Sequence, residues 1–267
     1  MYSFYTRAAE IACGEGRAAA CILVQRSGSA PREPGAKMIV FEDGSTEGSI
    51  GGNALEQKVI SLAAEVIRNR KPCLREFNLM ADLGMCCGGR VTVYIEPVHG
   101  LTPLVIFGAG HIGKALAGLA APTGFSVTLV DERENCFDDS IPHEVNKINL
   151  PPRMAIKRIS FSPAVCILIA THSHSLDRAL LALCLKETGG YLGMVGSRRK
   201  AILTRRILLA DSSLPSDALD RVEMPAGLDI HARHPREIAV SILGRLIQLR
   251  NHPETQTLKE CLNVLPS

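Results

Sequence analysis

The order of apolar and polar positions divides the chain into two parts with different patterns. In the first part, short apolar runs alternate with glycine-rich turns. The pattern predicts a helix over residues 3–13 and strands over 18–24, 37–41 and from residue 90 toward Pro97. A further helix follows the glycine-rich turn near residue 50, with apolar residues at 55, 59, 62, 63 and 66. We therefore predict a mixed α+β domain over residues 1–98.

The second part alternates apolar strands with helical segments. The expected strands are 104–107, 125–131, a buried strand with a polar exit over 165–175, and 191–195. The expected helices cover about 111–121, 176–187 and 236–250, and the segment 132–163 reads as irregular. This alternation is typical of a doubly wound parallel α/β sheet. We predict a Rossmann-like domain over residues 103–267, joined to the first domain by a linker over 98–103.

Charge and composition narrow the class of protein. The 267 residues carry a formal net charge of only +3, with 4% aromatic residues and no Trp. Basic runs such as 198–200 and 205–206 fit a solvated helix face better than a nucleic-acid surface. No apolar run approaches the roughly 20 residues of a membrane span, and Glu10 interrupts the N-terminal stretch where a secretory signal needs an apolar core. We expect a cytoplasmic protein with neither nucleic-acid nor membrane partners.

The nine cysteines include no C-x-x-C pair. This pattern fits neither a disulfide framework nor a zinc site. Cys166 and Cys184 lie in apolar runs, and we expect them to be core residues.

A glycine motif follows the first strand of the second part. Residues 104–113 read LVIFGAGHIG, with Gly108, Gly110 and Gly113 at G-x-G-x-x-G spacing and Asp131 at the end of the next strand. In a dinucleotide-binding turn, these glycines permit the tight turn, the approach of a pyrophosphate and close helix–strand packing, while the acid accepts from a ribose hydroxyl. The alternative is a Rossmann fold that binds no dinucleotide. His111, at the mouth of the turn, would contact ligand or cap the helix.

Two later strands also end in polar residues. Thr171 to His174, followed by Asp177, would form a polar wall around a phosphate, metal or cofactor. The alternative is a helix N-terminus capped by Ser175 with ordinary loop histidines beside it. Ser197, with the basic residues after it, could hold an anion.

The first part contains three small-residue motifs, at 28–32, 48–53 and 86–89. Their backbone N–H groups, helped by Arg32 and Lys37, could cradle an anion, although hairpin turns need glycine as well. Cys87 in Cys-Cys-Gly-Gly places a thiol where neighbouring N–H groups favour the thiolate. A thiolate can bind a soft metal or relay sulfur as a persulfide, whereas the alternative is an inert cysteine.

Six motifs carry a resemblance over nearly the whole chain: GSAPREPGAKM, EGSIGGNALE, GMCCGGRVTVYIEP, LVIFGAGHIGKALA, YLGMVGSRRK and PAGLDIHARHPREIAVSI. Together they resemble the XdhC/CoxI family, whose members mature xanthine dehydrogenase and related molybdenum hydroxylases. The resemblance implies an N-terminal XdhC/CoxI domain followed by a Rossmann domain. The departures of the chain from the family pattern include Ala30, Asn53, His234 and Arg236.

The resemblance implies an accessory chaperone rather than an enzyme. It would bind molybdenum cofactor (molybdopterin), support its sulfuration with a cysteine desulfurase, and deliver it to a xanthine dehydrogenase-type apo-enzyme; a homodimer is plausible. The alternatives are an oxidoreductase using NAD(P) or FAD, and a docking scaffold without a small ligand. No catalytic residue is predicted, and Cys87 is the predicted metal ligand. The predicted cofactor-binding residues are Arg32, Gly51, Gly52, Cys87, Gly88, Gly89, Gly108, Gly110, His111, Gly113, Asp131, His172 and Ser197.

Overall fold

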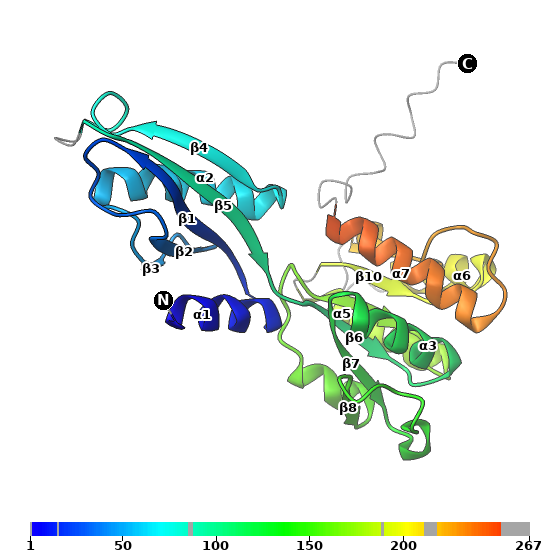
Figure 1. Cartoon of the computed structure of the whole chain (residues 1–267). Helices are drawn as coiled ribbons and strands as arrows, with labels where there is room; N and C mark the ends of the chain where they lie inside the picture. The colour runs from blue at the N-terminus through cyan, green and yellow to red at the C-terminus, as the bar shows by residue number, and fades with distance from the viewer. Residues whose placement is uncertain (1, 15, 85–87, 188–189, 211–217, 252–267) are drawn as a thin grey trace. The chain divides into compact units, whose positions relative to one another are not determined.

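The computed structural model divides into two compact units, Met1–Leu101 and Thr102–Ser267, which we call unit 1 and unit 2 (Figure 1). It describes every residue except 1, 15, 85–87, 188–189, 211–217 and 252–267. No helix in this described part of the chain combines the length and the apolar character needed to cross a bilayer.

Unit 1 is built on an antiparallel sheet with the strand order β3-β2-β1-β5-β4. The strands are β1 (Arg17–Ser27), β2 (Lys37–Phe41), β3 (Thr46–Gly48), β4 (Cys73–Asn78) and β5 (Arg90–His99). The helices are α1 (Tyr2–Cys13) and α2 (Asn53–Asn69).

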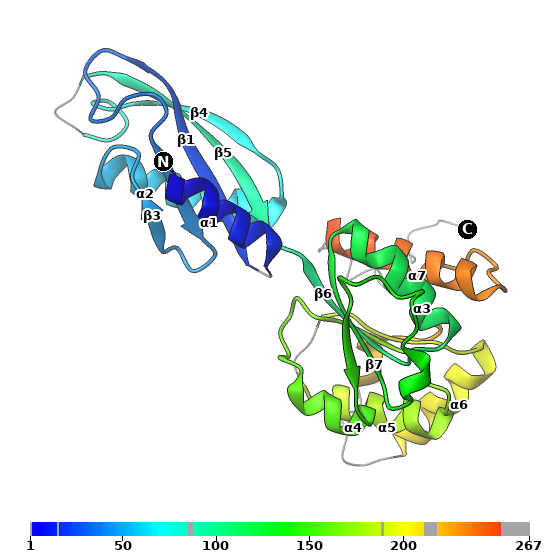
Figure 2. The ribbon, with the colours of Figure 1, turned by 60° about the horizontal axis from the view of Figure 1, so that its bottom comes forward.

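Both faces of the unit 1 sheet are covered, which explains the continuous apolar run in β1. Ala19 and Cys21 pack with apolar residues of α2, including Leu55. Their neighbour Ala18 points to the other face and packs with Ile11 of α1. Because successive side chains of a strand alternate between faces, a strand covered on both sides is apolar at every position. Figure 2 shows the two helices on either side of this sheet.

Unit 2 contains a parallel sheet with the strand order β11-β10-β9-β6-β7-β8. Its strands are β6 (Thr102–Phe107), β7 (Phe125–Asp131), β8 (Asn146–Asn149), β9 (Cys166–Ile169), β10 (Leu192–Met194) and β11 (Val222–Glu223). Its α-helices are α3 (His111–Ala120), α4 (Pro152–Ala155), α5 (His174–Cys184), α6 (Arg198–Leu209) and α7 (Pro235–Asn251). Short 3-10 turns occupy Ala121–Thr123, Glu134–Cys136, Ile156–Arg158 and Ala218–Arg221.

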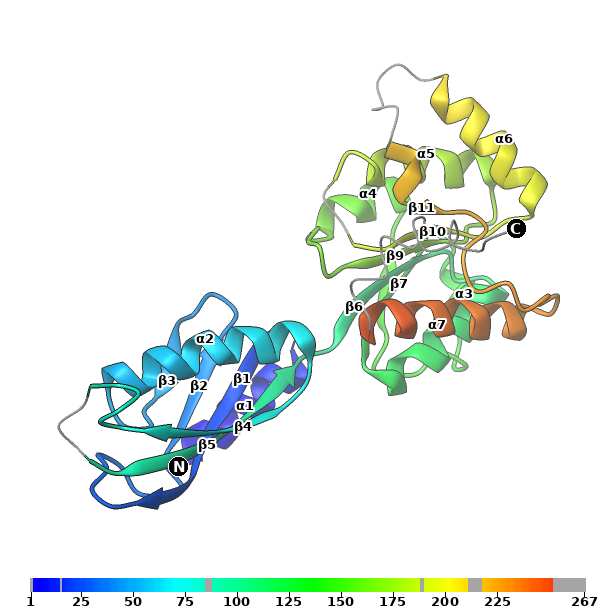
Figure 3. The ribbon, with the colours of Figure 1, turned by 90° about the horizontal axis from the view of Figure 1, so that it is seen from above.

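The helices of unit 2 form two layers around the sheet (Figure 3). Helices α3 and α7 pack on one face, and α4, α5 and α6 pack on the other. Cys166 and Cys184 are buried in these cores, as the sequence predicts. The two units confirm the predicted fold class, a mixed α+β part followed by a Rossmann-like doubly wound sheet.

The connection between the units is shorter than the predicted linker over 98–103. Strand β5 continues to His99 and β6 begins at Thr102. Pro97 and Pro103 do not end these strands, because each lies beyond the reach of one neighbouring strand. Pairing with β4 stops at Ile95, and pairing with β9 starts at Leu104. A proline is tolerated where one edge of its strand is unpaired.

Four strands of the structure are not predicted from the sequence. They are β3, β4, β8 and β11, of which β8 lies in the segment 132–163 that is expected to be irregular. All four are short, and β3, β4 and β8 are exposed at half or more of their positions. They therefore lack the apolar periodicity that identifies a strand in sequence, and pairing with a neighbouring strand stabilises them instead.

Candidate functional site

The G-x-G-x-x-G turn of unit 2 lies at the point where the strand order reverses. From β6 the sheet runs to β7 and β8 in one direction and to β9, β10 and β11 in the other. Gly108 has φ +117°, and a Cβ there would clash with the carbonyl oxygen of Ala170 and approach Thr171 Cα to 3.0 Å. The turns after β6 and β9 therefore touch. In open α/β sheets, this reversal point at the carboxyl ends of the strands is where ligands bind.

The other two glycines of the turn have different surroundings. A Cβ on Gly113 would clash with the carbonyl oxygen of Gly108, so Gly113 permits α3 to pack against the turn. A Cβ on Gly110 would meet nothing within 4 Å. His111, the first residue of α3, is exposed next to this space. Open space at Gly110, in front of a helix N-terminus, is the geometry that admits an anion.

Asp131 braces this turn from the end of β7. Its Oδ2 accepts from the backbone N–H of Ala109 at 2.8 Å and from Arg133 Nη2 at 2.9 Å. Its Oδ1 accepts from Arg133 N and Nε at 3.0 and 2.9 Å. Burial alone would raise the pKa of this carboxyl, but the hydrogen bonds from Arg133 and Ala109 lower it below the usual value. A ribose hydroxyl could reach Asp131 only if Arg133 moved.

The polar residues that follow β9 and β10 lie beside the glycine turn that follows β6. Ala170 N donates to Phe107 O, and Val195 N donates to Ile169 O, which joins the ends of the three strands. Ser173, rather than Ser175, occupies the N-cap position of α5. Buried Asp177 accepts from the N–H and the hydroxyl of Thr171 at 3.0 and 2.6 Å, and burial raises its pKa.

Two residues that are predicted to contact a ligand lie after the ends of these strands. His172 is exposed in the turn after β9. Ser197 caps α6 by accepting from Lys200 N at 3.3 Å. The structure thus places both residues at the same carboxyl edge as the glycine turn, where each remains a predicted ligand contact.

The small-residue motifs of unit 1 meet at one place, although they are far apart in sequence. A Cβ on Gly28 would lie 3.2 Å from Gly89 Cα, and one on Gly89 would lie 2.7 Å from Ser27 O. A Cβ on Gly51 would lie 2.9 Å from Pro31 Cγ and 3.9 Å from Arg32 Cγ. The 28–32 turn therefore contacts both the 48–53 turn and the Gly88-Gly89 turn. Cys86 and Cys87 lie outside the described residues.

An internal carboxylate occupies the anion cradle at the start of α2. Glu56 Oε1 accepts from the hydroxyl of Ser49 at 2.7 Å. It also accepts from the N–H groups of Ile50, Gly51 and Gly52 at 3.1, 3.4 and 3.2 Å. Burial alone would raise the pKa of Glu56, but these four hydrogen bonds lower it. The N–H groups that the sequence offers to a ligand thus serve Glu56 in this structure.

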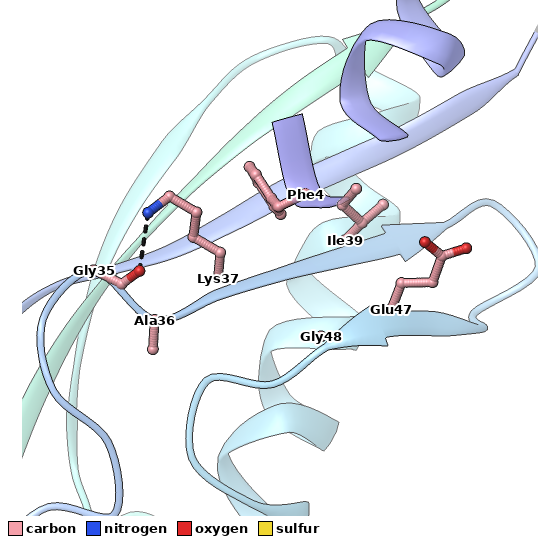
Figure 4. A pocket seen from close by; sticks show the side chains of 7 residues that line it. All are labelled: Phe4, Gly35, Ala36, Lys37, Ile39, Glu47 and Gly48. Carbon is pink, nitrogen blue, oxygen red and sulfur yellow. Dashed lines mark hydrogen bonds between the residues drawn. The ribbon is translucent and has the colours of Figure 1, made fainter. Parts of the chain in front are cut away.

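The two cations expected at this cradle differ in their contacts. Lys37 Nζ donates to the carbonyl oxygen of Gly35 at 2.9 Å and lies 5.6 Å from the centroid of the Tyr5 ring. Figure 4 shows this lysine at a pocket of about 270 Å³ that Phe4 and Ile39 also line. Arg32 is exposed beside Gly51. Within the described ranges, no three His, Cys, Asp or Glu side chains are grouped to hold a metal ion.

A groove between α3 and α7 is a candidate site that the sequence does not predict. Its volume is about 910 Å³, and residues of α3, the 138–140 turn and the start of α7 line it. His234 and Arg236, two of the departures from the family pattern, both line this groove, together with His111. The sequence shows only that these two residues differ from the family pattern, because it does not reveal that α3 and α7 pack together.

Comparison with known proteins identifies the family. Residues 104–246 match the model of the XdhC Rossmann domain, and residues 13–78 match that of the XdhC and CoxI family. The chain is 34% identical over 237 residues to uncharacterized protein YqeB of Escherichia coli, covering 86% of this chain and 43% of that protein. It is 33% identical over 159 residues to a Bacillus subtilis protein named as a probable xanthine dehydrogenase subunit, covering 59% of this chain and 46% of that protein. The chain therefore spans less than half the length of these two relatives.

A third relative and a solved structure extend the similarity. The molybdenum cofactor insertion chaperone PaoD of Escherichia coli is 25% identical over 269 residues, covering 87% of this chain and 83% of that protein. A crystal structure of a protein named xanthine dehydrogenase from Bacillus halodurans has a similar fold, with a TM-score of 0.53 and 22% identity over 94% of this chain and 97% of that one. Both parts of the chain match a family model, and the larger match alone covers more than half of its length. The chain belongs to the XdhC and CoxI family.

Proposed function

We propose that this protein is an accessory factor that binds molybdenum cofactor as cargo and delivers it to a molybdenum hydroxylase of the xanthine dehydrogenase type. The observation that carries the proposal is the meeting of three small-residue turns in unit 1. The 28–32 turn contacts both Gly51 and Gly89, and the sequence places Cys87 directly before Gly88. A relative named as a molybdenum cofactor insertion chaperone supports the same role.

The chemistry of these turns suits such a cargo. Molybdenum cofactor carries sulfur ligands on the metal and a phosphate, so a holder needs a soft ligand and an anion-binding group. Thiolates are soft ligands that suit metals of this kind, and a Cys87 thiolate would supply one. Exposed Arg32, which lies beside Gly51, would pair with the phosphate. Support for sulfuration with a cysteine desulfurase, and assembly as a homodimer, stay predictions of the same proposal.

The oxidoreductase alternative is supported by one observation and opposed by another. The open space at Gly110 would admit the pyrophosphate of NAD(P) or FAD. Asp131, however, already accepts four hydrogen bonds from Ala109 and Arg133, which leaves its carboxylate without a free acceptor position for a ribose. We therefore propose the cargo-binding role ahead of hydride transfer.

The test compares C87A with C13A, which removes an exposed cysteine of α1. Each protein is expressed in cells that make molybdenum cofactor, and the molybdenum that copurifies is measured by mass spectrometry. We expect C87A to retain less than about a tenth of the wild-type metal, because the loss of one strong ligand costs more than the roughly 1.4 kcal/mol of a tenfold change. C13A should retain all of it, and both variants should keep the wild-type melting temperature.

A second measurement separates binding from delivery and from hydride transfer. Each variant is added to an apo-hydroxylase with molybdenum cofactor, and hydroxylase activity is followed. Calorimetry with the cofactor is repeated in the presence of NAD. If C87A activates the hydroxylase as well as the wild-type protein does, the assignment of Cys87 is wrong. Strong binding of NAD without any binding of molybdenum cofactor would support the oxidoreductase alternative instead.

A further inference from the structure

The groove between α3 and α7, which we call the α3–α7 groove, combines basic side chains with an apolar wall. His111 and Lys114 come from α3, while His234 and Arg236 come from the start of α7. The described residues that line the groove include one acid, Asp138, and its carboxylate already pairs with Lys114. Arg236 is exposed. The basic end of the groove therefore carries a net positive charge.

Apart from Ser140, the other residues that line the groove are apolar residues or glycine. Leu119 and Val240 face it from the two helices and are 38% and 52% exposed. Gly118 precedes Leu119 near the end of α3 and also lines the groove. A Cβ on Gly118 would meet nothing within 4 Å, so the packing of α3 against its neighbours does not require glycine there.

A glycine inside a helix normally destabilises it relative to alanine. Close helix packing, tight turns or a positive φ usually explain such a residue, and none of these applies to Gly118. What Gly118 does provide is open space along the α3 side of the α3–α7 groove. This space, in a groove that Lys114, Arg236 and two histidines also line, favours an occupant over a structural need.

We propose that the α3–α7 groove binds a phosphomonoester of nucleotide size, separately from the cargo site in unit 1. Its volume of about 910 Å³ lies within the range of small-molecule sites, about 300–1,000 Å³. The phosphate group lies against Arg236, His111 and His234, since arginine pairs with phosphate through two parallel hydrogen bonds. The body of the ligand lies over Gly118, against Leu119 and Val240.

The test measures binding of adenosine 5′-monophosphate to the full chain by isothermal titration calorimetry. Inorganic phosphate should bind more weakly and compete, and adenosine should bind least, because the charged group supplies most of the recognition. R236Q should weaken binding about tenfold or more, since it removes a charged partner of the phosphate. R233Q, an equal change of charge three residues away and outside the groove, should leave the affinity within about twofold.

Two further variants act in opposite directions. D138N removes the carboxylate that neutralises Lys114 and should tighten binding about threefold or more. G118L places a large side chain in the groove and should abolish binding. Because leucine favours helix more than glycine does, G118L should melt at or above the wild-type temperature, which excludes unfolding as the cause.

A matched glycine change at the other end of the same helix identifies where the nucleotide binds. G110A fills the space in front of α3, outside the groove, and should leave the affinity within about twofold. If G110A abolishes binding and G118L does not, the nucleotide occupies the glycine turn, and the proposal is overturned. Failure of the wild-type protein to bind the nucleotide also overturns it. Either result leaves the Cys87 test of the cargo site unaffected.

Discussion

Unit 1 and unit 2 each contain a glycine-rich turn that leads into a helix. In each unit, a carboxylate accepts hydrogen bonds from the backbone of this turn. In unit 1, Glu56 accepts from three successive backbone N–H groups at the start of α2. In unit 2, Asp131 accepts from one N–H group of the glycine turn, that of Ala109, and from the N–H of Arg133 outside the turn. In the described part of the chain, no side chain accepts from the N–H groups of residues 110–113. The two turns look alike in sequence, yet one cradle is filled from within and the other is open.

The difference comes from one position in the first helical turn. Helix α2 has Glu56 there, whereas α3 has no acid in its first turn. A carboxylate in the first turn of a helix is stabilised by the helix dipole and by free N–H groups. The backbone N–H groups of a glycine-rich turn before a helix are therefore free for an anionic ligand only when the helix does not supply its own anion.

The largest effect should come from removing the Glu56 carboxylate that accepts from the N–H groups of the unit 1 turn. E56A removes four hydrogen bonds and leaves the N–H groups of Ile50 to Gly52 without their partner. We expect unit 1 to lose about 2 kcal/mol of its free energy of unfolding, in line with hydrogen bonds to a charged group. Urea unfolding followed by circular dichroism measures this loss.

Glu65 provides the control, because it is exposed on the same helix. E65A should change the free energy of unfolding by less than about 0.5 kcal/mol. Equal losses in E56A and E65A would show that Glu56 contributes no more than a surface charge. The contrast between the filled and the open turn would then have no energetic basis.

An effect of intermediate size should come from lowering the pH, which we expect to reduce the stability of unit 1 relative to that of unit 2. Both ring nitrogens of His99 lack a hydrogen-bond partner among the described residues, and its pKa is lowered to about 4 by burial, then by Arg70 and Arg17. The unfolded chain has an ordinary histidine pKa of about 6.5 and therefore binds the proton first as pH falls. Unit 1 should lose stability between pH 6.5 and 4, by an amount on the order of 1 kcal/mol.

In unit 2 the buried carboxyl of Asp177 is shifted in the opposite sense. Burial raises the pKa of Asp177, so its folded state takes up a proton before the unfolded chain does. Calorimetric scans at pH 7 and pH 5 should show the unit 1 transition move down relative to that of unit 2. H99F should remove this shift, and H143A, at a histidine 94% exposed, should keep it. A shift of the same size in H99F would assign the pH dependence to another group.

The smallest effect concerns one strained residue in each unit. Among the described residues, Arg70 and His231 are the non-glycine residues with positive φ, 54° and 56°. This conformation is costly for residues with a Cβ, so H231G should gain about 0.5–1 kcal/mol. R70G should gain a similar amount, because each glycine also loses one side-chain interaction, which for His231 is the exposed contact of Nδ1 with Asp229 Oδ1 at 3.2 Å. Thermal unfolding measures both, and a loss of stability in H231G would contradict the argument.

The sequence predicts the elements of this fold that bury an apolar face. The parallel strands β6 and β9 are predicted because their residues are apolar on both faces, and β7 because its apolar residues recur at every second position. Strands β3 and β8 are not, because their residues are mostly exposed. Such strands depend on a partner far away in sequence, which the local pattern does not identify.

The candidate sites are likewise only partly visible in the sequence. The motifs themselves are visible in sequence, including Gly28 to Arg32 and the glycines before α3. Their meeting through Gly51 and Gly89 is not visible, because the Gly89 contact depends on the antiparallel register of β1 and β5 and the Gly51 contact depends on the fold of the loop before β2. The partnership of Arg133 with Asp131, which competes with a ribose, also depends on side-chain geometry. Sequence therefore identifies the components of the sites, and the structure supplies their contacts.

The three glycines of the G-x-G-x-x-G turn carry unequal information for the study of other family members. Side chains at Gly108 and Gly113 would clash with backbone oxygens, so natural selection would retain both glycines even in a protein that had lost its ligand. Gly110 has no such steric requirement, because a side chain there would enter open space. Family members that have replaced Gly110 but kept the other two glycines would therefore be those in which the Rossmann turn supports the fold without binding a ligand.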